Sequence, residues 1–287
     1  MGKTEKVTKK EPPKVWGKKE RLFVLIILFG TALISGLLAL SSRDYKLPGL
    51  PRLKLTIPSF SLPKGETITI GSKVDQSARI NAKKEKQISE AFNQITKDLS
   101  GVYAFYLIDL KSGHAFGTGE GDVMQAASLI KLPLMLYAYG KVDDAKIEAM
   151  GKRSDNTVFW ELVAKFGEAT VQDYISNLGM KNTSLEENET TPKEIGDLFA
   201  KLYQEKEEKI LTYLTDTVFE DWLAKGVPEE IRVAHKYGRE VHVVNDAGII
   251  FAKDPFVLVV MTEGIVEKEA DATIPELTGM IYRKMVE

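Results

Sequence analysis

The run Leu22–Leu40 contains 19 consecutive residues without a charge, LFVLIILFGTALISGLLAL. At about 1.5 Å per residue, an α-helix of this length crosses the apolar core of a bilayer. A segment that is apolar on every side suits lipid better than the surface of a folded domain. The sequence therefore predicts a single N-terminal transmembrane helix over residues 22–40, with the lipid bilayer as its partner.

The charges beside this run predict its orientation. Residues 1–21 carry eight Lys and Arg against three Glu, whereas Arg43 and Lys46 follow on the other side. The positive-inside rule then makes residues 1–21 a cytoplasmic tail and keeps the rest of the single-pass chain outside the cytoplasm, at the cell membrane. A cleaved signal peptide is the alternative, but its apolar core is usually only about 7–15 residues long.

The remainder divides into a spacer and a domain. Residues 41–84 contain Pro48, Pro51, Pro58 and Pro63 and show no helical periodicity, which predicts an extended proline-rich linker. Residues 85–287 hold 22 Lys and Arg against 35 Asp and Glu, a net charge of −13. An acidic domain of this kind argues against nucleic acid as a partner.

Hydrophobic patterning predicts strands at both ends of residues 85–287 and helices between them. The strand-like stretches alternate or are rich in β-branched and aromatic residues; they are 102–110, 231–236, 241–251 and 255–261. Amphipathic stretches near 88–99 and 270–285 predict helices at the two ends. We expect an α/β (α+β) fold in which one antiparallel sheet, built from both ends of the domain, is flanked by helices.

A serine precedes a lysine by three residues in Ser128-Leu129-Ile130-Lys131, at the start of an apolar run. On a helix this spacing puts Lys131 on the same face as Ser128. A serine hydroxyl needs a neighbouring base to become a nucleophile, and an amine with a depressed pKa is a suitable base. The alternative is a polar residue that opens a core helix, with Lys131 pointing to solvent.

Two further motifs follow in order, Ser154-Asp155-Asn156 and Lys236-Tyr237-Gly238. Taken singly, the first is also typical of a helix cap and the second of a hairpin end. Taken together with the first motif, they supply a proton shuttle, Ser154, and an amide, Asn156, for Lys131 and the substrate. Lys236 would then hold a substrate carboxylate.

With these three motifs, residues 85–287 resemble the class A β-lactamase family and, more broadly, the penicillin-recognising serine hydrolases. The stretches 182–185, 190–192 and 245–250 are similar as well. The resemblance implies a helical subdomain beside the sheet, with the site between them. It implies that Ser128 opens a β-lactam amide through an acyl-enzyme. The backbone N–H groups of Ser128 and Arg239 would stabilise the oxyanion.

Two other readings remain open on the same residues. One is a penicillin-binding, D-alanyl-D-alanine peptidase-like enzyme that acts on cell-wall peptides, and the other is a catalytically weak binding domain. The small molecule bound is accordingly a β-lactam or a cell-wall peptide.

Three departures from the family pattern bear on this choice. Tyr237 replaces a small hydroxyl residue, so its contribution to substrate binding is altered. Ser128 and Ser154 are closer together than is usual, which predicts a reduced helical subdomain. The loop before Thr190 is short, and its Glu189 aligns with the family's deacylating glutamate. A solvated acidic loop is the alternative for Glu189.

The sequence implies no cofactor and no metal. There is no cysteine, which excludes a thiol nucleophile, disulfides and thiolate ligands. The three histidines, His114, His235 and His242, are scattered and form no pair with the spacing of metal ligands.

Overall fold

The computed structural model describes residue 28, residues 30–31 and residues 71–287, with side chains from residue 78 onward in the last range. The chain separates into two units, residues 1–67 and 68–287. In the first unit Leu28, Gly30 and Thr31 are helical. Within the described part of the chain, no helix is both long and apolar enough to cross a membrane. The tail 1–21 and most of the expected membrane segment 22–40 lie outside the described residues.

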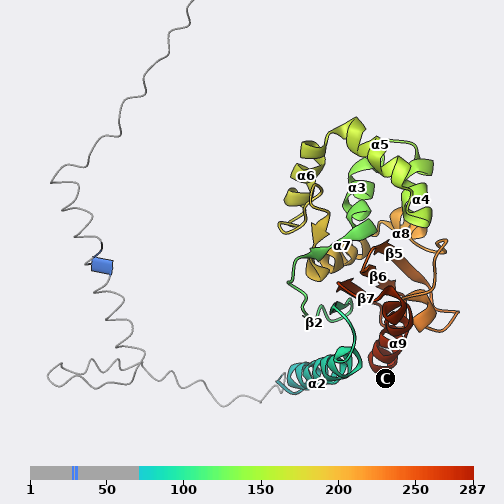
Figure 1. Cartoon of the computed structure of the whole chain (residues 1–287). Coiled ribbons are helices and arrows are strands. Elements are labelled where there is room, and N and C mark those ends of the chain that lie inside the picture. Colours follow the sequence, from blue (N-terminus) through green and yellow to red (C-terminus); the bar gives the residue numbers. More distant parts are fainter. Residues whose placement is uncertain (1–27, 29, 32–70) are drawn as a thin grey trace, which may run out of the picture. The chain divides into compact units, whose positions relative to one another are not determined.

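The strands from the two ends of the domain pair in one five-stranded antiparallel sheet, as the sequence predicts (Figure 1). Their order across the sheet is β2 (Ala115–Thr118), β1 (Val102–Asp109), β7 (Phe256–Glu263), β6 (Val243–Ile250) and β5 (Val233–Glu240). β5 therefore lies at an edge, where its outer side is free to face other parts of the domain. A second, two-stranded sheet pairs β3 (Met124–Gln125) with β4 (Glu189–Thr190).

Helices cover both faces of the large sheet, and most of them are formed by the middle of the chain. Figure 1 shows α3, α4, α5 and α6 gathered on one side of the strands, with α2 and α9 on the other. The helices are α2 (Gly71–Thr96), η1 (Ala127–Ile130), α3 (Lys131–Ala138), α4 (Asp144–Arg153), α5 (Asn156–Phe166), α6 (Glu168–Asn177), α7 (Pro192–Gln204), α8 (Glu208–Tyr213), η2 (Ala224–Gly226) and α9 (Glu267–Val286).

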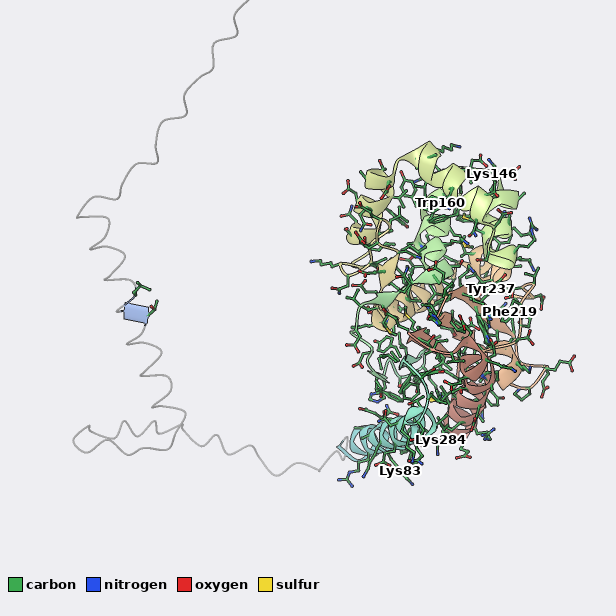
Figure 2. The ribbon with its side chains drawn as sticks, viewed as in Figure 1. Lys83, Lys146, Trp160, Phe219, Tyr237 and Lys284 are labelled. Atoms are coloured by element: carbon green, nitrogen blue, oxygen red, sulfur yellow. The ribbon has the colours of Figure 1, made fainter. Side chains whose placement is uncertain are left out.

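The expectation of an extended linker up to residue 84 is wrong for residues 71–84, which form the first half of α2. The prolines of this region end at Pro63, so nothing after it blocks a helix. The second half of α2 buries Ile88 and Phe92 completely or nearly so. Lys84 Nζ also donates to Met285 O of α9 at 3.1 Å, and Figure 2 locates Lys83 and Lys284 on these two helices.

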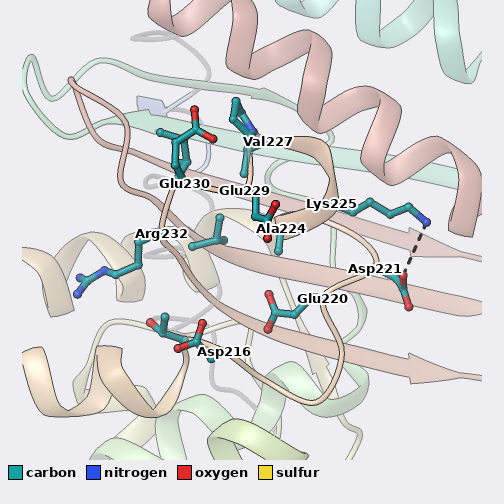
Figure 3. Close-up of a pocket in the computed structure, with 13 residues that line it drawn as sticks. Asp216, Glu220, Asp221, Ala224, Lys225, Val227, Glu229, Glu230 and Arg232 are labelled. Carbon is teal, nitrogen blue, oxygen red and sulfur yellow. Dashed lines mark ion pairs between the residues drawn. The ribbon is translucent and has the colours of Figure 1, made fainter.

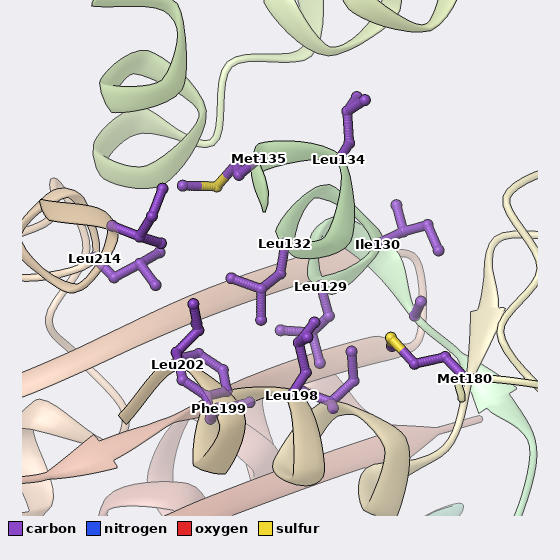
Figure 4. Packing of buried hydrophobic residues seen from close by; sticks show 14 of the residues in the cluster. Leu129, Ile130, Leu132, Leu134, Met135, Met180, Leu198, Phe199, Leu202 and Leu214 are labelled. Atoms are coloured by element: carbon purple, nitrogen blue, oxygen red, sulfur yellow. The ribbon is translucent and has the colours of Figure 1, made fainter. Parts of the chain in front are cut away.

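The two faces of the sheet bury separate apolar clusters, because successive strand residues point to opposite sides. On β1, Tyr103, Phe105 and Leu107 face the α2 and α9 side, whereas Ala104 and Tyr106 face the α3 and α7 side. The apolar run after Ser128 belongs to the cluster on the α3 and α7 side. Figure 4 shows Leu129 and Leu132 directed toward α7, which carries Leu198, Phe199 and Leu202. The segment that carries the Ser–Lys motif is therefore fixed in the core.

A buried ionic group joins β5, β6 and the connection between α8 and β5. His235 and Asp246 are both fully buried, with His235 Nδ1 at 2.8 Å from Asp246 Oδ1. Asp246 Oδ2 accepts from Leu223 N at 3.0 Å, and His235 Nε2 lies 3.3 Å from Glu220 Oε2. Burial by itself would lower the pKa of His235, but the carboxylates of Asp246 and Glu220 outweigh it and raise the pKa to about 9.

The contribution of His235 to folding stability should therefore fall as the pH rises from about 6.5 to about 9. The folded chain holds the His235 proton up to about pH 9, whereas the unfolded chain releases it near 6.5. This contribution is complete below pH 6.5, and its loss is on the order of 3 kcal/mol. Burial lowers the pKa of two lysines, Lys131 and Lys236, which contribute with the opposite sign. Urea unfolding of the full-length wild type and of a His235 variant between pH 6 and pH 9.5 therefore measures the His235 contribution as the difference between the two proteins.

The matched variants are His235→Gln and His242→Gln. The stability of the wild type in excess of His235→Gln should fall by about that amount over this pH range, whereas its difference from His242→Gln, at an exposed histidine of the β5–β6 turn, should stay constant. An unchanged slope in His235→Gln would assign the effect to another group.

Candidate active site

Ser128 and Lys131 meet at the junction of η1 and α3. Lys131 Nζ donates to Ser128 Oγ at 2.9 Å, so the three-residue spacing does place the two groups together. The residue before Ser128, Ala127, has φ of +49°, in the left-handed region that a residue with a side chain rarely adopts. This turn lifts the half-buried Ser128 toward open space while its apolar neighbours enter the core.

Lys131 does not point to solvent, which removes the alternative interpretation of the motif. The residue is 2% exposed, and its amine also donates to Ser154 O at 2.7 Å, Ser154 Oγ at 3.1 Å and Asn156 Oδ1 at 2.5 Å. Burial lowers the pKa of Lys131 to about 8, against the opposing effect of the Asp155 and Glu240 carboxylates. About a tenth of the amine is consequently unprotonated at pH 7, far more than for an ordinary lysine, and able to accept a proton.

Ser154, Asp155 and Asn156 form the tight connection between α4 and α5. Ser154 ends α4 with φ of +53°, and the Asp155 carboxylate caps α5 by accepting from Val158 N at 3.1 Å. The helix-cap reading of this motif is thus right for Asp155. It does not compete with the functional reading, because the cap orients Ser154 and Asn156 toward Lys131.

Lys236 reaches the same place from β5. It is fully buried, and its amine donates to Ser154 Oγ at 2.9 Å and to Tyr237 O at 2.6 Å. Burial and the neighbouring charge of Lys131 hold the pKa of Lys236 well below its usual range. The hydroxyl of Ser154 therefore lies between two amines of depressed pKa, a suitable arrangement for passing a proton.

Gly238 lets the edge of β5 approach the nucleophile. A Cβ at this position would lie 2.7 Å from Ser128 N and 3.1 Å from Ala127 Cβ, so a side chain has no room. On the same edge, His235 N donates outward to Leu214 O at 2.7 Å. Backbone N–H groups alternate along a strand, so Arg239 N–H points outward as well, beside the N–H of Ser128. Two donors are thus available for one oxyanion.

A pocket of about 340 Å³ opens beside Ser128. Residues from η1, α3, α5, the loop before β4 and the end of β5 line it; they are Ala127, Ser128, Ile130, Lys131, Asn156, Phe159, Trp160, Leu185, Glu186, Asn188 and Glu240. The structure thus brings Ser128, Lys131, Ser154, Asn156 and Lys236 into one hydrogen-bonded group. Of this group, Ser128, Lys131 and Asn156 line the pocket.

The side chains of Tyr237 and Arg239 lie on the opposite face of β5 and do not line the pocket. The Tyr237 ring packs 5.3 Å from that of Phe219, and Figure 2 shows the two side by side. Arg239 pairs with Asp271 and lies 5.2 Å from the Trp222 ring. Strand alternation explains both positions, because the residues that share a face with Lys236 are Gly238 and Glu240.

Glu189 is also absent from the pocket lining, although its neighbours Glu186 and Asn188 are present. It pairs with Gln125 in the small sheet, and its backbone exchanges hydrogen bonds with Ser184 at 2.9 and 3.1 Å. The short loop places this residue in a strand beside the site.

Glu240 and Trp160 are among the pocket residues that the sequence did not predict. Glu240 is four residues after Lys236 and therefore faces the same side of β5, which the two-residue period of a strand would have indicated. Trp160 follows Asn156 by one helical turn on α5, so the helical period would have indicated it. Trp160 is 62% exposed.

A larger hollow of about 800 Å³ lies elsewhere, between the end of α8 and the start of β5 (Figure 3). Its charged lining is mostly acidic and comprises Asp216, Glu220, Asp221, Lys225, Glu229, Glu230 and Arg232. Neither Ser128 nor Lys131 reaches it, so its size does not mark the chemical site. Across residues 78–287, the acidic and histidine side chains form no group of three that could hold a metal ion.

Comparisons with known proteins agree with this arrangement of strands and helices. A model of the beta-lactamase enzyme family matches residues 85–149 and 146–285. The solved structure of PBP-A shares 20% identity and a TM-score of 0.64, covering 71% of this chain and 96% of its own. The β-lactamase from Sphaerobacter thermophilus DSM 20745 shares 21% identity and a TM-score of 0.64, covering 70% of this chain and 98% of its own.

An ancestral class A β-lactamase (GNCA) is similar to the same extent, with 20% identity, a TM-score of 0.63 and coverage of 69% and 99%. These likenesses show a shared fold. Among curated proteins, none matches the sequence.

The reactivity of Ser128 should follow the protonation of Lys131. Labelling by a serine-directed fluorophosphonate should rise about tenfold per pH unit below pH 8 and level off above it, because only the neutral amine accepts the hydroxyl proton. Intact mass against time at each pH gives the rate. Lys131→Arg keeps the positive charge and should label slowly at every pH. A wild-type profile without a rise would exclude Lys131 as the base.

Proposed function

The chain belongs to the beta-lactamase enzyme family, and we propose that residues 85–287 are a serine acyl-hydrolase in which Ser128 opens a β-lactam amide. The observation that carries this proposal is the hydrogen bond of 2.9 Å between Lys131 Nζ and Ser128 Oγ, made by a buried amine of lowered pKa. A surface lysine near a serine would have neither property.

Acylation follows from the geometry of the group. Ser128 Oγ attacks the carbonyl carbon and its proton passes to Lys131, while the N–H groups of Ser128 and Arg239 receive the developing oxyanion. Ser154, hydrogen-bonded to both amines, then donates its hydroxyl proton to the leaving nitrogen and receives the proton of Lys131 in exchange. Asn156 holds the Lys131 amine in place.

A penicillin-binding, D-alanyl-D-alanine peptidase-like enzyme is the second candidate, and the position of Glu189 favours it. The resemblance assigns activation of the deacylating water of a β-lactamase to Glu189, and a base must lie within hydrogen-bond reach of its water. Glu189 does not line the pocket, and the carboxylates that do are those of Glu186 and Glu240. The solved structure of a PBP-A mutant is described as an acyl-enzyme complex with penicillin G, so a related fold holds such an ester.

Mixing the full-length protein with penicillin G should add one ligand mass at Ser128 within minutes. We expect the adduct to persist for hours, because Glu189 is outside the pocket. Intact mass spectrometry at seconds and at hours measures both steps, and Ser128→Ala should give no adduct. An adduct that clears while the penicillin is consumed would instead indicate a β-lactamase with a working base. Absence of an adduct in the wild type would contradict both enzymatic candidates and favour a catalytically weak binding domain.

We also propose that residues 22–40 anchor this domain to the cell membrane, with residues 85–287 outside the cytoplasm. The proposal rests on the uncharged run and the basic tail before it. The natural chain has no cysteine, so a single introduced one reports its own position.

A cysteine at exposed Lys181 should react with a membrane-impermeant maleimide added to intact cells that express the full chain. A second variant with a cysteine at Thr4 should react only after lysis. The reverse pattern would place the domain in the cytoplasm.

A further inference from the structure

The charge around the pocket is negative at its mouth. Three lining residues are charged, namely Lys131, Glu186 and Glu240. Lys131 is buried and its amine lies within hydrogen-bond distance of four oxygens, whereas both glutamates belong to the exposed part of the wall. A substrate that enters therefore meets two carboxylates before it reaches the amine.

The carboxylate of Glu240 is held in position. Its Oε1 accepts from Asn188 Nδ2 at 2.9 Å, and its Oε2 accepts from Gln125 Nε2 at 3.4 Å. Both donors are neutral amides, so they fix the carboxylate without cancelling its charge. Strand alternation directs Glu240 to the same side as Lys236 and Gly238, which face the nucleophile.

An aromatic ring completes this wall of the pocket. Trp160 lines the pocket while 62% exposed, and its ring packs against that of Phe159 at 4.9 Å in a T-shaped arrangement. Figure 2 shows Trp160 on the helical side of the domain. An exposed indole and a fixed carboxylate in one pocket are the combination that recognises organic cations, through the ring face and through charge.

Lys236, to which the sequence assigned a substrate carboxylate, does not line the pocket, and neither does Arg239. Lys236 is fully buried with its amine directed to Ser154 and Tyr237 O, and Arg239 faces away toward Asp271. The site thus combines a nucleophile with an acidic and aromatic mouth.

We propose that the acyl substrate carries a cationic group, an ammonium or guanidinium, that lies between Trp160 and Glu240 while its carbonyl lies at Ser128. This inference rests on the proposed function, because it requires that Ser128 form an ester. It adds the substrate class, an acyl donor with a basic side chain.

Thioesters that differ only in the side chain test the inference. The probes are benzyl thioesters of Nα-acetyl-lysine, Nα-acetyl-norleucine and Nα-acetyl-glutamate, each as both enantiomers, given to the full-length protein. In the reaction the bond from Ser128 Oγ to the carbonyl carbon forms and the carbon–sulfur bond breaks. The hydroxyl proton passes through Lys131 to the leaving thiol. Thiol release in the first turnover gives the rate, and intact mass confirms the adduct.

The lysyl ester should acylate Ser128 about tenfold faster than the norleucyl ester, about threefold each from the carboxylate and the ring. The glutamyl ester should be the slowest of the three. In Glu240→Gln the ratio of lysyl to norleucyl rates should fall about threefold, and Glu240→Lys should favour the glutamyl ester. The control is Glu187→Gln, at an exposed residue that follows Glu186 in the sequence but does not line the pocket. This variant should keep the wild-type ratio of lysyl to norleucyl rates.

The outcomes separate the two proposals. Equal lysyl and norleucyl rates in the wild type, or a ratio in Glu240→Gln equal to that in Glu187→Gln, would overturn the substrate class and leave acylation intact. Absence of an adduct with every ester and with penicillin G would overturn acylation at Ser128, and the inference with it.

Discussion

The amine of Lys131 is withdrawn from water, and the domain around it is built to satisfy that amine. An unpaired buried ammonium is costly, so its partners must be held in place by elements that are themselves rigid. η1 supplies Ser128, the α4–α5 connection supplies Ser154 and Asn156, and the edge strand β5 closes the group with Lys236. Two of these elements hold a residue at positive φ, Ala127 and Ser154, and such strain costs of order 1–3 kcal/mol each. The packed core beneath the motif keeps both conformations in place.

β5 divides its residues between chemistry and support. Lys236, Gly238 and Glu240 face the nucleophile, whereas His235 and Tyr237 face the cluster beneath α9. The buried pair of His235 with Asp246 ties this strand to β6, so that its edge keeps a fixed distance from Ser128. Tyr237 of the third motif belongs to the supporting face: its ring packs against Phe219, and its backbone carbonyl accepts a hydrogen bond from Lys236.

The site has two parts, the hydrogen-bonded group around Lys131 and the mouth of the pocket, and the first is the part that carries the three sequence motifs. The hydrogen-bonded group of two lysines and two serines has the residue order of the family's three motifs. The mouth is formed by Glu186 of the loop before β4, Glu240 at the end of β5 and Trp160 of α5. In the proposed reaction, chemistry at the carbonyl depends on the hydrogen-bonded group and the choice of acyl donor depends on the mouth, so the two can change independently.

The sequence by itself determined the order of strands and helices, the antiparallel sheet from both ends of the domain, and the meeting of Ser128 with Lys131. These features depend on residues close in the chain or on periodic burial, which a linear pattern records. Residues 71–84 form a helix that the sequence allows, but the prolines upstream of it led to the prediction of a linker. Only the tertiary structure decided that Lys131 is buried, that Glu189 lies outside the pocket, and that Glu240 and Trp160 lie in its wall. Those positions depend on how β5, α5 and the loop before β4 pack against one another, and contacts between distant segments leave no period in the sequence.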